Sequence, residues 1–127
     1  MLKISQAEFQ VIVEGQGAPQ VSVLLPTYRS SYGKEALASL LAQRAVTLEL
    51  LISDDASGDE TPQRIRRQLA DYHGPHRVLL RQGQERLRLD HFALLAQAAT
   101  SEVVIMAHDD DVALPQRASR VLDLFMA

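Results

Sequence analysis

Short apolar runs alternate with helical periodicity along most of this chain. Four runs bounded by polar or turn-forming residues predict buried strands; they cover residues 21–25, 48–52, 78–80 and 103–107. After each run, apolar residues recur every three or four positions and predict helices; these cover residues 34–44, 61–72, 91–99 and 115–125. We expect Pro26 to close the first strand. Thr61 followed by Pro62 is typical of an N-cap and the first helical position.

Four successive strand–helix units predict an α/β fold with a mostly parallel sheet, helices on both faces and right-handed crossovers. Residues 1–20 do not follow this pattern. The alternation of Phe9, Val11 and Val13 predicts an extra edge strand or an interface arm. We therefore divide the chain into an N-terminal extension, 1–20, and a domain, 21–127. In such sheets ligands bind at the carboxyl ends of the strands, so the loops that follow the strands are where chemistry is expected.

The loop after the last predicted strand is acidic. Apolar residues 103–107 end abruptly in His108, Asp109, Asp110 and Asp111. Adjacent carboxylates repel one another unless a cation or solvent relieves the repulsion, and hard oxygen ligands favour Mg²⁺ or Mn²⁺ over Zn²⁺. His108 could be a further ligand or a hydrogen-bonding neighbour. The alternative is an acidic turn at the N-terminus of the next helix, although three acids exceed what such a turn requires.

Two further acids, Asp54 and Asp55, directly follow the second predicted strand. Turn and capping roles account for polar residues after them, such as Ser57 and Asp59, but account less well for the pair itself. A carboxylate can accept a hydrogen bond from the imide N–H of uracil. The pair is therefore a candidate for the recognition of a nucleotide base.

The first and third loops carry groups that fit a nucleotide. A tyrosine just beyond a strand end, such as Tyr28, can stack on a planar base, and such stacking is worth about 1–3 kcal/mol per base. The alternative is a ring packed on the rim of the sheet. Arg86 lies in the third loop, 82–89, where a guanidinium would match the geometry of a diphosphate. The alternative there is a solvated basic loop.

Composition narrows the classes of function. The 127 residues suffice for one domain with a real core. A net charge of −3 gives no basic field of the kind that nucleic acid or an anionic membrane surface requires. The absence of cysteine excludes disulfides and thiolate-bound zinc. No stretch could span a bilayer and the start lacks an apolar signal core, so we expect a cytoplasmic protein.

Together, these loops resemble those of the inverting glycosyltransferases of family 2, which have the GT-A fold. The resemblance covers about residues 20 to 120, in the order and spacing of the family. The acidic block after the second strand and the acidic cluster before Pro115 are its distinctive parts. The matching stretches are residues 21–28, 40–43, 49–61, 91–98 and 108–117.

The resemblance implies a role for several candidates in binding a nucleotide sugar. Tyr28, preceded by Pro26 and Thr27, corresponds to the residue that stacks on the base. Asp55 corresponds to the carboxylate that reads the uracil edge, with Asp54 beside it. The implied site therefore lies where the first two strands end.

The acidic cluster resembles the DxD motif, whose last acid binds the metal on the nucleotide diphosphate. If Pro115 sets the register, the motif is residues 108–110 and Asp110 is the direct ligand. Asp109 and Asp111 then contact ribose, water or the metal, with His108 as a further metal ligand. His108 stands where the family usually has the first aspartate. Arg86 falls near a basic position that contacts the donor in some members, and Arg29 stands where asparagine is frequent.

The implied function is metal-dependent binding of UDP or a UDP-sugar, with Mn²⁺ or Mg²⁺, as the donor-binding part of an inverting glycosyltransferase. The ion neutralises charge on the leaving diphosphate, and a carboxylate base takes the proton of the acceptor hydroxyl. A full family domain is roughly twice the size of this chain, and the base belongs to its second half. We expect either the N-terminal portion of a transferase or a naturally short relative, whose site is completed by self-association or by another chain.

Three other functions fit parts of the pattern. A non-catalytic nucleotide-binding or regulatory module would keep the same loops without transferring a sugar. A receiver-like phosphoacceptor signalling domain also clusters acids around Mg²⁺, but it needs a lysine after its fifth strand, and Lys34 is the last lysine in this chain. A nucleotidyltransferase usually needs a glycine-rich basic loop after the first strand, and that loop is missing.

Overall fold

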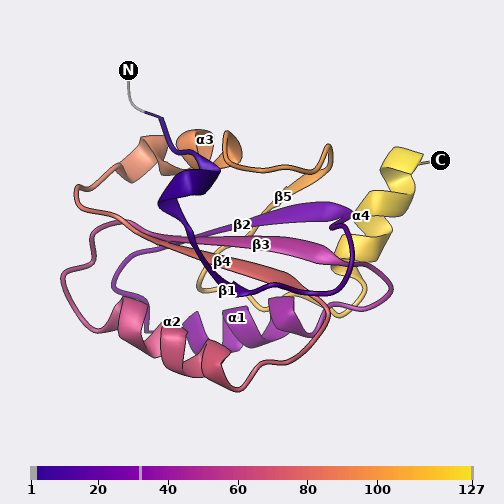
Figure 1. The fold of residues 1–127 in the computed structure, drawn as a ribbon, viewed down its shortest axis with the longest axis horizontal. Helices are drawn as coiled ribbons and strands as arrows, with labels where there is room; N and C mark the ends of the chain where they lie inside the picture. The colour runs from indigo at the N-terminus through magenta and orange to yellow at the C-terminus, as the bar shows by residue number, and fades with distance from the viewer. Residues whose placement is uncertain (1–2, 32, 127) are drawn as a thin grey trace.

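The computed structural model describes residues 3–31 and 33–126, and five strands of this part form one sheet (Figure 1). The strands are β1 Gln10–Val13, β2 Val21–Thr27, β3 Leu48–Asp54, β4 Arg77–Gln82 and β5 Val104–Met106. Their spatial order is β1-β4-β3-β2-β5. Strands β2 to β5 run parallel to one another, and β1 is antiparallel to β4 at one edge. The predicted mostly parallel sheet is confirmed.

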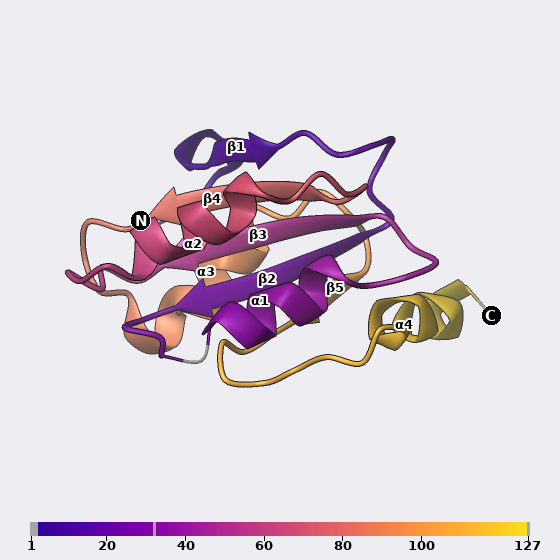
Figure 2. The same cartoon turned by 90° about the horizontal axis from the view of Figure 1, so that it is seen from below.

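Helices cover both faces of this sheet, as predicted. They are α1 Gly33–Leu41, α2 Thr61–Ala70, α3 His91–Ala96, α4 Arg117–Met126 and the short 3-10 helices η1 Gln6–Glu8 and η2 Arg88–Asp90. α1 and α2 lie on one face, and α3 and η1 lie on the other (Figure 1). Figure 2 shows α4 at the end of the sheet opposite the loops that follow β2 and β3. No helix in the described part of the chain is long and apolar enough to cross a membrane.

Strand β3 runs through the centre of the sheet and is buried along its whole length. Alternate residues of a strand point to opposite faces. Leu48, Leu50 and Ile52 therefore join the core beneath α1 and α2, whereas Leu51 joins the core beneath α3. Strands covered on both faces read as continuous apolar runs, which is why the sequence predicted them.

The buried carboxylate of Glu49 connects several segments on the face of the sheet that carries α3 and η1. Glu49 is 2% exposed and accepts hydrogen bonds from Ser22 Oγ at 2.8 Å and from the backbone N and Oγ1 of Thr100 at 3.0 and 2.8 Å. Gln6 Nε2 lies 3.4 Å from its Oε2. Because these donors come from β2, from the turn before β5 and from η1, Glu49 fastens the N-terminal segment to the sheet.

The N-terminal segment contributes both a strand and core side chains. β1 is an edge strand, as one of the two predictions for residues 1–20 has it, and it pairs only with β4 in the described sheet. Ile4 and Phe9 are 2% and 8% exposed and join the core beneath α3. The division of the chain into 1–20 and 21–127 stays a prediction.

Pro26 does not close the first predicted strand, because β2 continues through it to Thr27. The ladder between β2 and β5 ends at Leu24 and Met106, whereas the ladder between β2 and β3 continues to Thr27 and Asp54. One side of β2 is therefore unpaired at Pro26. The missing N–H of proline costs no ladder hydrogen bond on that side.

Several predicted helix boundaries are also wrong: α1 ends at Leu41 rather than at residue 44, and α4 begins at Arg117 rather than at residue 115. α2 begins at Thr61, so its N-cap is Glu60 rather than Thr61, and the backbone N–H of Thr61 donates to Asp59 Oδ1 at 2.9 Å. α3 ends at Ala96, earlier than predicted. Ala98 lies in the turn that follows and is buried, so it prolongs the apolar periodicity beyond the end of the helix.

Candidate functional site

The carboxyl ends of β2, β3 and β4 meet at one edge of the sheet, and most of the predicted site residues gather there. Pro26 and Thr27 are the last two residues of β2 and pair with the last two residues of β3, while Tyr28 follows directly. A cavity of about 350 Å³ opens at this edge, lined by residues of the turns that follow β3 and β4. This is the edge where parallel sheets bind ligands.

Asp54, the last residue of β3, holds two loops together. Its side chain is buried, and its Oδ1 accepts hydrogen bonds from Thr27 Oγ1 at 2.8 Å and from Ser57 Oγ at 2.6 Å. Its Oδ2 accepts from the backbone N of Ser57 at 3.0 Å. The Ser57 hydroxyl oxygen also accepts from the backbone N of Arg29, a residue with φ +46°. Asp54 is therefore a positioning residue that fixes the turns after β2 and β3.

Asp55 holds the loop after β4 instead. Its Oδ1 accepts from the backbone N of Leu87 at 2.6 Å, and its Oδ2 accepts from the backbone N of Arg88 at 2.9 Å and from Arg86 Nε at 3.0 Å. Burial acts to raise the pKa of Asp55, but the two backbone donors, Arg86 and His91 together hold this pKa below its ordinary value. The carboxylate is therefore ionised at neutral pH.

Tyr28 and Asp55 are joined through Arg86. The guanidinium carbon of Arg86 lies 3.5 Å from the centroid of the Tyr28 ring, and that of Arg29 lies 5.3 Å from it. The same Arg86 forms the ion pair with Asp55. The structure thus brings together the predicted base-stacking tyrosine, the predicted base-reading carboxylate and the predicted basic residue of the third loop.

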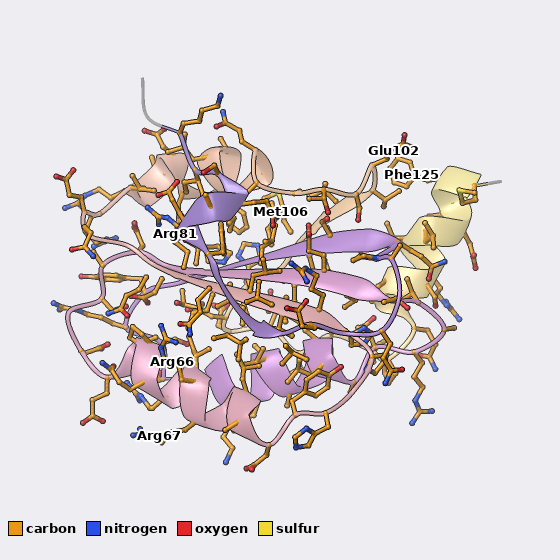
Figure 3. All side chains as sticks on the ribbon, in the orientation of Figure 1. Arg66, Arg67, Arg81, Glu102, Met106 and Phe125 are labelled. Atoms are coloured by element: carbon orange, nitrogen blue, oxygen red, sulfur yellow. The ribbon has the colours of Figure 1, made fainter. Side chains whose placement is uncertain are left out.

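Beneath this group lies a second set of polar contacts that the sequence analysis did not identify. Ser53 Oγ accepts from Arg81 Nη1 at 3.1 Å and lies 2.8 Å from His91 Nε2. Arg81 also pairs with Glu8, and Figure 3 shows it on the side of the sheet that carries η1 and α3. Burial lowers the pKa of His91, so the imidazole is neutral at pH 7. In the sequence, the one indication of a role for His91 was that it begins residues 91–98, one of the stretches that resemble the family.

The predicted metal residues follow β5 and are mostly exposed. His108 is exposed and makes an edge-on contact with the Phe92 ring, with centroids 5.4 Å apart. Asp109 is half-buried, while Asp110 and Asp111 are exposed. The backbone N of Asp111 donates to the carbonyl of His108 at 3.3 Å, which closes a turn.

These four side chains do not converge. Within residues 3–31 and 33–126, no three His, Asp or Glu side chains come close enough to hold a metal ion by themselves. The donor chemistry nevertheless fits Mg²⁺ or Mn²⁺, which proteins usually hold with one or two carboxylates while phosphate and water oxygens complete the coordination. The exposed carboxylates after β5 suit a metal that arrives with a diphosphate better than a site built from protein alone.

This chain is similar to known proteins both in sequence and in fold. The sequence profile described as Glycosyl transferase family 2 matches residues 22–127. The mannosyltransferase PcManGT from Pyrobaculum calidifontis in complex with GDP-Man and Mn²⁺ is 26% identical, with a TM-score of 0.68, over 94% of this chain and 36% of that chain. S. aureus TarS 1-349 in complex with UDP-GlcNAc is 26% identical, with a TM-score of 0.66, over 84% of this chain and 31% of that chain.

A further structure, S. aureus TarS 1-349 in complex with UDP, has a TM-score of 0.70 at 24% identity, over 84% of this chain and 32% of that chain. The chain spans about a third of the length of these structures. Their similarity shows that the α/β sheet and its helices have the GT-A fold, as the sequence resemblance implied. The family profile covers far more than half of the chain, and the chain therefore belongs to glycosyl transferase family 2.

Proposed function

We propose that this chain binds UDP or a UDP-sugar together with Mn²⁺ or Mg²⁺, as the donor-binding part of a glycosyltransferase. The observation that carries the proposal is the arrangement of Tyr28 and Asp55 around Arg86. Arg86 shows that a planar group can stack on the Tyr28 ring and donate an N–H to Asp55 at the same time. Uracil has these two features, a planar ring and an imide N–H. Guanine has them too, so the choice of base is part of the test.

The metal is proposed to bind at the acidic turn after β5. Asp110 is the direct ligand, with Asp111 and His108 as further members of the metal group and Asp109 directed to the ribose. A divalent ion bound there would neutralise the charge that develops on the leaving diphosphate. The carboxylates of the acidic turn would hold that ion at the strand edge where Tyr28 binds the base, because β2 pairs with both β3 and β5.

Sugar transfer needs more than these residues. The acceptor hydroxyl must lose a proton to a base on the opposite face of the sugar, and no carboxylate of this chain is assigned that role. We propose that the acceptor site and the base, which an inverting transfer requires, are supplied by protein other than these 127 residues of the same molecule. A further part of a longer transferase, a second copy of this chain or another chain could supply them. A nucleotide-binding module without transfer would keep the binding properties and lack the turnover.

The test is calorimetric titration of UDP into the protein with Mn²⁺, and again after the metal is removed with EDTA. We expect binding that weakens at least tenfold without metal, in Tyr28→Ala and in Asp110→Asn. Asp123→Asn removes an equivalent exposed charge from α4 and should leave the affinity unchanged. The proposal is wrong if UDP binds equally well to Tyr28→Ala, or if neither UDP nor GDP binds. Tighter binding of GDP than of UDP would change the assigned base.

A further inference from the structure

We propose that Gln43 and Ser39 are positioning residues for the metal group: they hold the segment that follows the acidic turn, residues 108–111, and thereby fix the place of Asp110. This inference rests on the proposed function, because it concerns the same carboxylates. It adds that the placement of the metal ligand depends on two side chains at the carboxyl end of α1. These two side chains, which we call the α1 clamp, are not themselves members of the metal group.

The acidic turn is anchored through the backbone on either side of it. Before the turn, the N–H of Ala107 donates to the carbonyl of Leu24 in β2 at 2.8 Å. After the turn, the N–H of Ala113 donates to Ser39 Oγ in α1 at 2.9 Å. No ion pair of the described residues includes a carboxylate of the turn. The place of the turn therefore depends on one anchor in the sheet and one anchor in α1.

Gln43 extends the second anchor along the chain. It is 6% exposed and lies two residues beyond the end of α1. Its Nε2 donates to the carbonyl of Leu114 at 2.7 Å, and its Oε1 accepts from the backbone N–H of Ala118 at 2.9 Å. Figure 2 shows the segment between β5 and α4 running alongside α1. The α1 clamp thus holds residues 113–118 at three backbone groups.

A glutamine suits this place because its amide is both a donor and an acceptor. Its oxygen satisfies an N–H of the first turn of α4, which has no partner within that helix. Its second N–H donates to the carbonyl of Ser39 at 3.2 Å, which joins the two clamp residues. Ser39 is also both donor and acceptor, because its hydroxyl donates to the carbonyl of Ala36 at 2.7 Å. A methionine at position 43 would leave the backbone partners of Gln43 without a hydrogen bond, although the side chain has a similar length.

The short distance along the chain links the α1 clamp to the metal group. Asp110 and Asp111 directly precede Val112, and Ala113, the first residue that the clamp holds, comes next. Loss of the clamp frees the end of the turn that follows these carboxylates, whereas the anchor in β2 stays in place. The base site lies elsewhere, since other loops hold Tyr28 and Asp55. We therefore expect variants of the clamp to bind the metal less well and to bind a base normally.

The test compares the binding of UDP, with Mn²⁺ and with EDTA, with the binding of uridine, which has the base but no phosphate to hold a metal. Titration gives the dissociation constants for the wild type, Gln43→Met and Ser39→Ala. With Mn²⁺, we expect the UDP affinity to fall about tenfold in Gln43→Met and about threefold in Ser39→Ala, which loses fewer bonds. The affinity for uridine, and for UDP in EDTA, should remain that of the wild type.

Two further variants separate positioning from a general loss of stability. Ser39→Thr keeps the hydroxyl and should restore the metal-dependent affinity that Ser39→Ala loses. Gln68→Met is the matched control, because Gln68 Nε2 also donates to a carbonyl of another helix, that of Lys34 in α1, at 2.8 Å. Its affinity for UDP should not change. In the metal-free protein, the N–H of Ala113 in Ser39→Ala and that of Ala118 in Gln43→Met should exchange with solvent about two- to tenfold faster.

The outcomes distinguish the two proposals. The positioning role is overturned if Gln43→Met and Ser39→Ala keep the metal-dependent affinity of the wild type, or if their uridine binding weakens as much as their binding of UDP with Mn²⁺. If Gln43→Met does not fold, Ser39→Ala and Ser39→Thr decide the question. The proposed function fails if the wild type binds UDP equally well with Mn²⁺ and with EDTA, or does not bind it, and the positioning role then fails with it.

Discussion

Asp54 and Asp55 are neighbours in the chain, yet their carboxylates share no hydrogen-bond partner within the part of the protein that the structure describes. Asp54 is the last residue of β3 and binds Thr27 and Ser57, whereas Asp55 binds the turn that starts at Arg86. The two acids therefore fasten different loops to one strand end. Their adjacency does not create an unrelieved repulsion, because separate sets of donors surround each of them.

The role of Asp54 as a positioning residue predicts a stability loss in Asp54→Asn. The amide oxygen can keep the hydroxyl donors, but the amide NH₂ would face the backbone N–H of Ser57, which would lose its acceptor. We expect the free energy of unfolding to fall by about 1–3 kcal/mol, the usual cost of a buried unsatisfied donor. Urea denaturation at pH 7 measures it. Glu60→Gln is the control, since Glu60 is exposed and its side chain makes no capping bond; an equal loss in both variants would contradict this role.

The lowered pKa of Asp55 leads us to expect that the stability of the folded protein decreases in acid. Its folded pKa lies below the ordinary value of 3.8, so the unfolded chain takes up this proton first as the pH falls. The stability that Asp55 contributes is present above pH 3.8 and is lost as the pH falls through the lower, folded pKa. Between pH 5 and pH 3, the free energy of unfolding should therefore fall less steeply in Asp55→Asn than in the wild type. Parallel curves would show that Asp55 has the same pKa in both states.

From the surroundings of His76 we expect a second pH dependence of the stability, at higher pH than that of Asp55. Its Nδ1 accepts the backbone N–H of Leu48 at 3.1 Å, and its Nε2 lies 3.1 Å from the carbonyl of Gln43. The imidazole must be neutral, because a proton on Nδ1 would face another N–H. Burial lowers the folded pKa below the ordinary 6.5, so the unfolded state binds the proton first and stability falls as the pH drops below about 6.5.

The measurement is the free energy of unfolding between pH 7.5 and pH 5. One proton gives a slope of at most about 1.4 kcal/mol per pH unit. The slope should be smaller in His76→Gln, whereas His73→Gln changes an exposed histidine and should keep the slope of the wild type. Burial also lowers the pKa of His91, so His91 contributes to the slope in the same direction. A steeper slope in His76→Gln is incompatible with this assignment.

The two buried histidines should also be opposite tautomers. His76 accepts through Nδ1, which leaves its proton on Nε2. Ser53 Oγ accepts from Arg81, and among the contacts of the described residues Nε2 of His91 is the acceptor available for the buried Ser53 hydroxyl proton; we therefore expect the proton of His91 on Nδ1. Long-range ¹⁵N NMR at pH 7.5 distinguishes the two forms. In Ser53→Ala, His91 alone should change its ring nitrogen shifts, and finding both histidines in one tautomer would disprove the arrangement at Ser53.

The sequence predicted the sheet well because burial on both faces leaves a strong pattern. A short apolar run between two predicted helices, such as Leu50, Leu51 and Ile52, indicates a strand that is covered on both faces. The partners of Asp55 left no such pattern, because two of its donors are backbone N–H groups more than 30 residues away, and any residue except proline has one. His91 was missed for a related reason: its burial results from the packing of α3 on the sheet and not from its neighbours in the chain.

The residues before position 22 also take part in the packing, although the family profile does not match them. Ile4 and Phe9 fill the core beneath α3, and Gln6 reaches Glu49. A protein shortened to begin at Val21 would expose Leu79 and Leu51 on that side and would leave β4 as a bare sheet edge. The family profile therefore leaves out residues that contribute to the core, and experiments on the proposed nucleotide site should retain the first twenty residues.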